Sequence, residues 1–184
     1  GDPYMVRFSR MFLAACCLAL LVSICSCSGG GDEPGVFVSK EAGFSIKYPE
    51  NWVIYAEVGS WIPVVEGESP LDDEEDGFSE YVAVDVETLP SKMSVDEYFD
   101  HYRNELATEN TFFEQHEEGE IDIDGTRARY ILYDKEMPEA YWRILVYVMV
   151  KNGKGYVINC AAENQQFSRH QETLMDIAHT FEFK

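Results

Sequence analysis

Residues 72–77, DDEEDG, carry five carboxylates in six positions, the densest run of metal-ligand side chains in the sequence. Asp72, Glu74 and Asp76 fit positions one, three and five of an EF-hand calcium loop. Position twelve, which supplies a bidentate Glu in that loop, is Ala83, and the pattern predicts a strand instead of a flanking helix. We therefore predict a solvated acidic loop and no cofactor. The alternative is an irregular Ca²⁺ site that makes the domain respond to divalent cations.

Three arginines, Arg127, Arg129 and Arg143, fall in segments with the alternating pattern of strands. We expect them to pair across the sheet with Asp85 or Glu87, because opposite charges on neighbouring strands attract. The alternative is that they line a cleft for a carboxylate ligand, which a guanidinium can bind through two hydrogen bonds.

Three aromatic residues, Trp61, Tyr141 and Trp142, border predicted loops. Large aromatic side chains are common anchors in protein interfaces. We therefore name Trp61 and Trp142 as candidate contacts for a ligand or partner. Trp52 is expected in the core instead.

Catalytic signatures are missing from the sequence, which has no GxSxG and no HExxH motif. Cys160 lies in an apolar run without an adjacent base, so we expect a small buried hydrophobe rather than a nucleophile. The histidines are expected at scattered surface positions: His101, His116, His170 and His179. We predict no catalytic residue and no enzyme activity; an envelope hydrolase with an unconventional site is the alternative.

Residues 1–26 are interpreted as upstream residues followed by an export signal, because a short segment with two arginines precedes an apolar run over 11–24. Fourteen residues are too few to cross a hydrocarbon core, which needs about 20. The stretch ICSC at 24–27 resembles the lipobox of bacterial lipoproteins, in which Cys27 would carry the lipid. Residues 27–35 would then form a flexible tether. A plain secretory signal is the alternative.

The charge of the segment 27–184 is strongly negative. Removing residues 1–26 takes away two of the 14 basic and one of the 34 acidic residues, which leaves 12 − 33 = −21. Such a domain repels phosphate backbones and anionic headgroups, so nucleic acid is excluded as a partner and membrane attachment would rest on the lipid.

Hydrophobic periodicity predicts one domain over 36–184 with two helices among eight strands. The strand Tyr81–Leu89 alternates, and the sequence Ser94-Val-Asp-Glu97 is a capping box that starts a helix. Asp-Gly and Asn-Gly pairs predict hairpins. We predict an α+β fold, a three-layer α/β/α sandwich with a mostly antiparallel central sheet and one main helix on each face. The expected strands are 36–38, 44–49, 52–58, 81–89, 119–124, 126–133, 141–150 and 155–161; the expected helices are 94–108 and 165–179; the expected loop is 66–80.

The segment GFSIKYPENW at 43–52 resembles the opening of PsbP-like domains, a superfamily named after an extrinsic subunit of photosystem II. The segments IDGTRAR at 123–129, GYVI at 155–158 and IAHTFEF at 177–183 follow in the expected order. The resemblance covers about 36–184 and implies an α/β/α sandwich. It also implies an accessory, assembly or binding role, and many bacterial members are lipoproteins.

These observations together predict a membrane-tethered, non-catalytic binding or accessory lipoprotein of the bacterial envelope, on the extracytoplasmic side. Its partners would be the membrane, through the lipid anchor, and an envelope protein or a small ligand.

Overall fold

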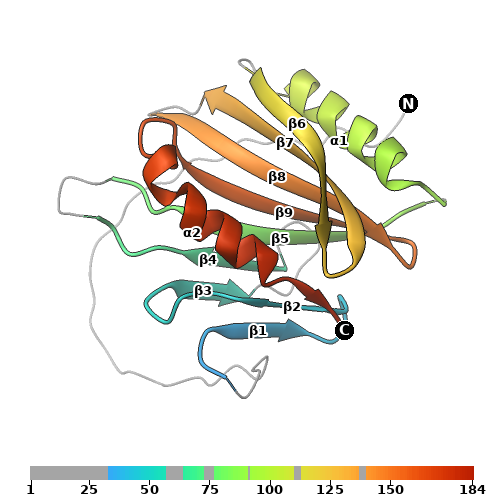
Figure 1. Ribbon diagram of the computed structural model, residues 1–184, viewed down its shortest axis with the longest axis horizontal. Helices are drawn as coiled ribbons and strands as arrows, with labels where there is room; N and C mark the ends of the chain where they lie inside the picture. Colours follow the sequence, from blue (N-terminus) through green and yellow to red (C-terminus); the bar gives the residue numbers. More distant parts are fainter. Residues whose placement is uncertain (1–32, 57–63, 73–76, 91, 110–112, 137–139) are drawn as a thin grey trace, which may run out of the picture.

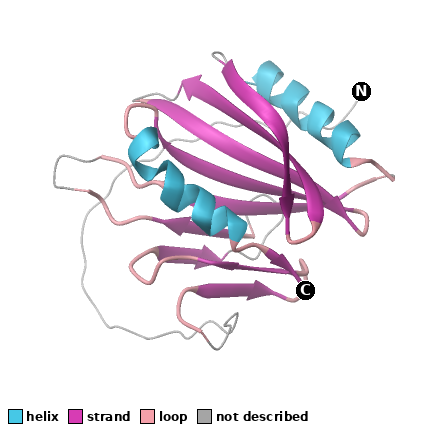
Figure 2. Cartoon of the chain, in the orientation of Figure 1, coloured by secondary structure: helices cyan, strands magenta, loops and turns pink. Residues whose placement is uncertain are grey.

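The computed structural model describes residues 33–56, 64–72, 77–90, 92–109, 113–136 and 140–184 (Figure 1). Two helices accompany a mostly antiparallel sheet (Figure 2). The predicted helices are confirmed to within two residues at each end. The elements are β1 (Val36–Ser39), β2 (Phe44–Lys47), β3 (Val53–Ala56), β4 (Val65–Glu68), β5 (Tyr81–Thr88), α1 (Val95–Glu109), β6 (Phe113–Ile123), β7 (Thr126–Glu136), β8 (Tyr141–Lys151), β9 (Lys154–Glu163), α2 (Phe167–His179) and β10 (Glu182–Phe183).

The main sheet has seven strands in the order β3-β4-β5-β9-β8-β7-β6, and every neighbouring pair is antiparallel. Two of its hairpins turn at the predicted pairs Asp124–Gly125 and Asn152–Gly153. All four residues have positive φ angles of 50 to 76°, which a tight two-residue turn of this kind requires. Local turn chemistry therefore sets the register at the turn ends of the β6–β7 and β8–β9 hairpins.

The predicted loop 66–80 is wrong at its start, because Val65–Glu68 form β4 between β3 and β5. Val65 is buried and Gly67 leaves room for the ring of Tyr48; a Cβ added to Gly67 would lie 2.3 Å from that ring. A four-residue strand with two Glu and one Gly has almost no apolar pattern, which explains the error.

The end of the chain forms a strand that is missing from the expected strands. Glu182–Phe183 form β10, which pairs with β2 beside β1 in a separate three-stranded sheet. Phe181 is buried and stacks on Phe44 with ring centroids 5.2 Å apart. The small sheet is therefore fastened to the core through these aromatic rings.

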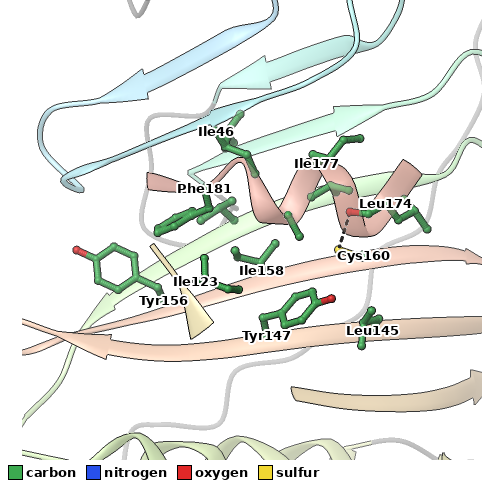
Figure 3. Packing of buried hydrophobic residues seen from close by; sticks show 14 of the residues in the cluster. Ile46, Ile123, Leu145, Tyr147, Tyr156, Ile158, Cys160, Leu174, Ile177 and Phe181 are labelled. Atoms are coloured by element: carbon green, nitrogen blue, oxygen red, sulfur yellow. Dashed lines mark hydrogen bonds between the residues drawn. The ribbon is translucent and has the colours of Figure 1, made fainter. Parts of the chain in front are cut away.

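The two helices pack with two different sets of strand residues. Leu145 and Tyr147 of β8 join the cluster that contains Leu174 and Ile177 of α2 (Figure 3). The alternate residues of β8, Ile144, Val146 and Val148, join the cluster that contains Tyr98 and Phe99 of α1. Because successive strand residues point to opposite faces, β8 is buried on both faces, as its apolar sequence predicts.

Cys160 of β9 is fully buried, and its Sγ lies 3.6 Å from the carbonyl oxygen of Leu174 (Figure 3). Burial raises the pKa of this thiol well above its ordinary value. The expectation of a buried hydrophobe is confirmed.

The predicted capping box at the start of α1 is confirmed. The Ser94 amide donates to Glu97 Oε2 (2.8 Å), and the Glu97 amide donates to Ser94 Oγ (3.2 Å). These bonds satisfy two backbone donors that a helix start leaves open. Among the described residues, neither helix is long and apolar enough to span a membrane.

Candidate functional site

A buried carboxylate, Asp134, organises one end of the main sheet. Its side chain is only 7% exposed and faces Arg143 of the next strand, which donates from Nε to Oδ1 (2.7 Å) and from Nη2 to Oδ2 (2.9 Å). Asn164 Nδ2 donates to the same Oδ2 (2.6 Å). Burial alone would raise the pKa of Asp134, but hydrogen bonds from Arg143 and His116 outweigh it and hold this pKa below its ordinary value.

The sheet brings these residues together from distant parts of the sequence. Asp134 and Arg143 are paired across β7 and β8, and Asn164 directly follows β9. His116 lies in edge strand β6, where the register with β7 shifts between Gln115 and Glu117. Such a bulge re-aims a side chain, and His116 Nε2 lies 3.0 Å from Asp134 Oδ2.

A pocket of about 430 Å³ adjoins this cluster, and its lining is mainly polar. The pocket is lined by Ala140, Tyr141, Glu163, Asn164 and Gln165. Asn164 is shared, since it lines the pocket while its amide is held by Asp134. Tyr141 is half exposed at the rim. The arrangement offers fixed hydrogen-bonding groups to a polar ligand.

Trp142, a predicted partner contact, is half-buried and does not line this pocket. Its ring packs edge-on against Phe78 and tilted against Tyr81, with centroids 5.7 and 5.6 Å apart. It supports the cluster that contains α1 rather than presenting an open face. Trp61, the other predicted contact, lies outside the described residues, as does Cys27.

None of Arg127, Arg129 and Arg143 pairs with Asp85 or Glu87, so this expectation is wrong; Arg143 pairs with Asp134. Arg127 and Arg129 both bind Asp96 in the first turn of α1, through Nη1 at 2.8 and 2.7 Å. The hydrogen bonds from Arg127 and then Arg129 lower the pKa of Asp96 to about 2.

The sheet order explains this difference in partners. Strands β8 and β9 separate β7, which carries both arginines, from β5, which carries Asp85 and Glu87. Asp85 accepts instead from Asn159 Nδ2 (2.9 Å), and Glu87 accepts from the Tyr98 hydroxyl (2.6 Å).

The predicted acidic loop is described at Asp72 but not at Glu74 or Asp76. Asp72 pairs with Arg169 (2.7 Å) and lies 3.2 Å from His170 Nε2, both on α2. Within the described part of the chain, no group of three or more His, Cys, Asp or Glu residues is arranged to hold a metal ion. The described residues therefore give no support to the alternative of a Ca²⁺ site.

A second polar cluster at this loop escaped sequence reasoning. Ser69 and the buried Glu80 bind each other, with Ser69 Oγ donating to Glu80 Oε2 at 2.6 Å and the Glu80 amide donating to Ser69 Oγ at 3.0 Å. His170 Nε2 lies 3.5 Å from Glu80 Oε1. His170 follows Phe167 by three residues and precedes Leu174 by four, so the helical period placed it beside the core stripe. This spacing was the signal in the sequence that could have placed His170 next to the core.

Ser69, Glu80 and His170 do not form a catalytic triad. A serine nucleophile must give its proton to a histidine that a carboxylate orients. Here Ser69 Oγ donates to Oε2 of the Glu80 carboxylate, and His170 Nε2 lies near the other oxygen, Oε1. The cluster ties the two ends of the loop together and to α2.

The model of the PsbP-like protein family matches residues 33–183. A comparison with curated proteins gave no match.

Several solved structures share the fold. The chain is similar to cyanobacterial PsbP (CyanoP) from Synechocystis sp. PCC 6803, with 16% identity and a TM-score of 0.62 over 84% of this chain and 96% of that one. LpqN of Mycobacterium tuberculosis, described as involved in cell envelope biogenesis, has 15% identity and a TM-score of 0.56 over 84% and 87%. The Ran-binding protein Mog1p of Saccharomyces cerevisiae has 15% identity and a TM-score of 0.52 over 77% and 90%.

Proposed function

Because the chain belongs to the PsbP-like family, we propose that it is a non-catalytic binding module held at the extracytoplasmic side of a bacterial membrane. The apolar run at 11–24 and the sequence ICSC at 24–27 support export and attachment of a lipid to Cys27. Two acyl chains on one residue bind a bilayer far more stably than a single chain. Residues 27–35 would keep the domain close to the membrane surface.

The observation that carries the binding role is the polar pocket beside Asp134. Its Asn164 amide is fixed by a buried carboxylate that Arg143 also holds, so the hydrogen-bonding groups are oriented before a ligand arrives. Fixed groups reduce the entropy lost on binding. Ser69 lies in a cluster with a histidine and a carboxylate, but its hydroxyl donates to the carboxylate. This arrangement does not activate the serine as a nucleophile, so it favours a binding role over hydrolysis.

The known relatives in fold are compatible with a binding role without defining a partner. One similar structure is a protein described as involved in cell envelope biogenesis, and another is described as Ran-binding. Those descriptions belong to those proteins. For this chain we propose an envelope protein or a small polar ligand as the partner, and no nucleic acid, because the domain is strongly acidic.

The domain that presents this pocket is proposed to be a three-layer α/β/α sandwich with one helix on each face. Support comes from the alternation of β8 residues between the cluster of α1 and the cluster of α2. In this arrangement both helices brace the sheet, and the ends of its strands remain open for binding.

The anchor is tested with a pair of cysteine variants of the full chain in bacteria fed labelled palmitate. We expect label in the natural chain and in Cys25→Ser, and none in Cys27→Ser, which should also leave the membrane fraction. Label that persists in Cys27→Ser, or unmodified Cys27 by mass spectrometry, would contradict the anchor.

The pocket is tested separately by pull-down from detergent-solubilised envelope. Gln165→Ala removes a lining side chain, and Gln171→Ala removes an exposed glutamine on α2 that does not line this pocket. A specific partner should be lost with the first variant and retained with the second. Equal recovery with both variants would remove the pocket from the proposal.

A further inference from the structure

The sheet face that carries α1 continues beyond this helix onto β5, β4 and β3. Paired residues of neighbouring strands point to the same face. Tyr55 pairs with Glu66, Glu66 with Ala83, and Ala83 with Asn159. Asn159 pairs in turn with Val146, which packs in the cluster of α1. We call this continuation the β3–β5 face; it comprises Val53, Tyr55, Glu66, Glu68, Ala83 and Asp85.

Apolar side chains are exposed on the β3–β5 face. Val53 is 52% and Tyr55 is 46% exposed, and they are two of the four large hydrophobic residues exposed among the described residues. Ile54, between them, packs into the core on the other side. Tyr102 marks the border of α1, where its hydroxyl donates to Asn159 Oδ1 (3.2 Å).

Negative charge is concentrated next to these apolar side chains. Among the described residues, none of the ion pairs involves Glu66, Glu68 or Asp85. Burial, and then repulsion by Glu68 and Asp85, raises the pKa of Glu66. Burial also raises the pKa of Asp85 to about 6, and repulsion from Glu87 adds to the rise, although the bond from Asn159 opposes it. Within the described parts of the chain, these carboxylates have no ion-pair partner.

We propose that the β3–β5 face binds a cationic amphipathic segment of a partner protein. This inference rests on the proposed binding function and adds to it a second binding surface, which shares no residue with the pocket beside Asp134. Apolar side chains of the segment would cover Val53 and Tyr55, while its lysines and arginines would pair with Glu66, Glu68 and Asp85. A second copy of the chain is disfavoured, because two molecules with a formal charge of −20 repel each other.

The test uses the full chain and a dye-labelled amphipathic peptide, (LKKLLKL)₂, followed by fluorescence anisotropy at physiological salt. Glu66→Gln with Glu68→Gln, and separately Val53→Ser with Tyr55→Ser, should each weaken binding at least tenfold. The matched control, Glu41→Gln with Glu50→Gln, removes two exposed carboxylates elsewhere and should change binding less than twofold. Melting temperatures check that all variants fold.

A second readout is the release of protons on binding, which reports where the cation binds and not how tightly. A cation bound beside Asp85 lowers its pKa, so mixing the chain with the peptide at pH 6 in weak buffer should release protons. Asp85→Asn should abolish most of this release.

Three results would overturn the inference. Hexalysine, with the same charge as the peptide, could bind as tightly, which would reveal only general attraction. The two face variants and the control could lose affinity equally. The chain could form a dimer in sedimentation that Val53→Ser with Tyr55→Ser disrupts, which would assign the face to self-association. None of these results affects the labelling of Cys27 or the pull-down at Gln165, so failure here is distinguishable from failure of the proposed function.

Discussion

The carboxylate of Asp85 allows the sharpest test of the structure, because its ionisation opposes folding. Its folded pKa is about 6 instead of 3.8, mainly through burial. Each pKa unit corresponds to about 1.4 kcal/mol, so ionised Asp85 lowers the free energy of unfolding by about 3 kcal/mol. Asp85→Asn removes this charge and keeps an oxygen that can accept the bond from Asn159. We expect the variant to be more stable at pH 7.5, by about 1 to 3 kcal/mol, since relaxation reduces the effect.

The gain should depend on pH in a defined direction. A group whose folded pKa is raised binds its proton more tightly in the folded state, so its stabilisation is present below about pH 3.8 and is lost as the pH rises through 6. The difference between Asp85→Asn and the natural chain should therefore be largest above pH 7. It should shrink between pH 6 and pH 4, and nearly vanish below that.

Urea unfolding of the full chain, followed by tryptophan fluorescence at several pH values between 4 and 8, measures this difference. The matched control is Asp176→Asn, which removes the same charge from an exposed position of α2 and should give a change within about 0.5 kcal/mol at every pH. The reasoning would be refuted by an Asp85→Asn variant that is less stable at pH 7.5. A gain that is identical at pH 4 and pH 8 would refute it as well.

Three further expectations concern packing, capping and thiol chemistry. Gly67→Ala would bring a Cβ to 2.3 Å from the Tyr48 ring and should lower stability by at least about 2 kcal/mol. Gly77→Ala meets nothing within 4 Å and should change stability little; equal effects in urea unfolding would contradict the close contact. Ser94→Ala should lose about 1 kcal/mol through the missing cap, and an unchanged urea midpoint would count against it. The buried thiol of Cys160 should react with a thiol reagent only after unfolding, and rapid labelling under native conditions would disprove its burial.

Local signals in the sequence predicted most of the elements. The capping box at Ser94 and the turn pairs Asp124–Gly125 and Asn152–Gly153 each involve residues close in sequence, and each is found in the structure. The apolar run of β8 predicted burial on both faces, which the two core clusters confirm. A helix start, a tight turn or a buried strand depends on residues close in sequence, so the residue types alone predict it.

The partners of charged residues could not be predicted in the same way. Arg127 and Arg129 were expected to reach Asp85, but strands β8 and β9 lie between them in the sheet. Strand order is a property of the whole fold, and alternation along one strand does not encode it. His116 is a similar case, because a bulge in β6 sets its direction and the sequence has no turn residue that marks it.

Two aspartates of the same sheet, the buried Asp134 and the half-buried Asp85, show why a carboxylate without a cation is informative. Asp134 is surrounded by Arg143, His116 and Asn164, and its pKa falls. Among the described residues, Asp85 accepts a bond from the Asn159 amide and lies near the Glu87 carboxylate, and its pKa rises. The fold can therefore place an arginine beside a buried carboxylate, and at β5 it does not. A cation that arrives with a partner would relieve the repulsion among the carboxylates of the β3–β5 face, as the proposal for this face requires.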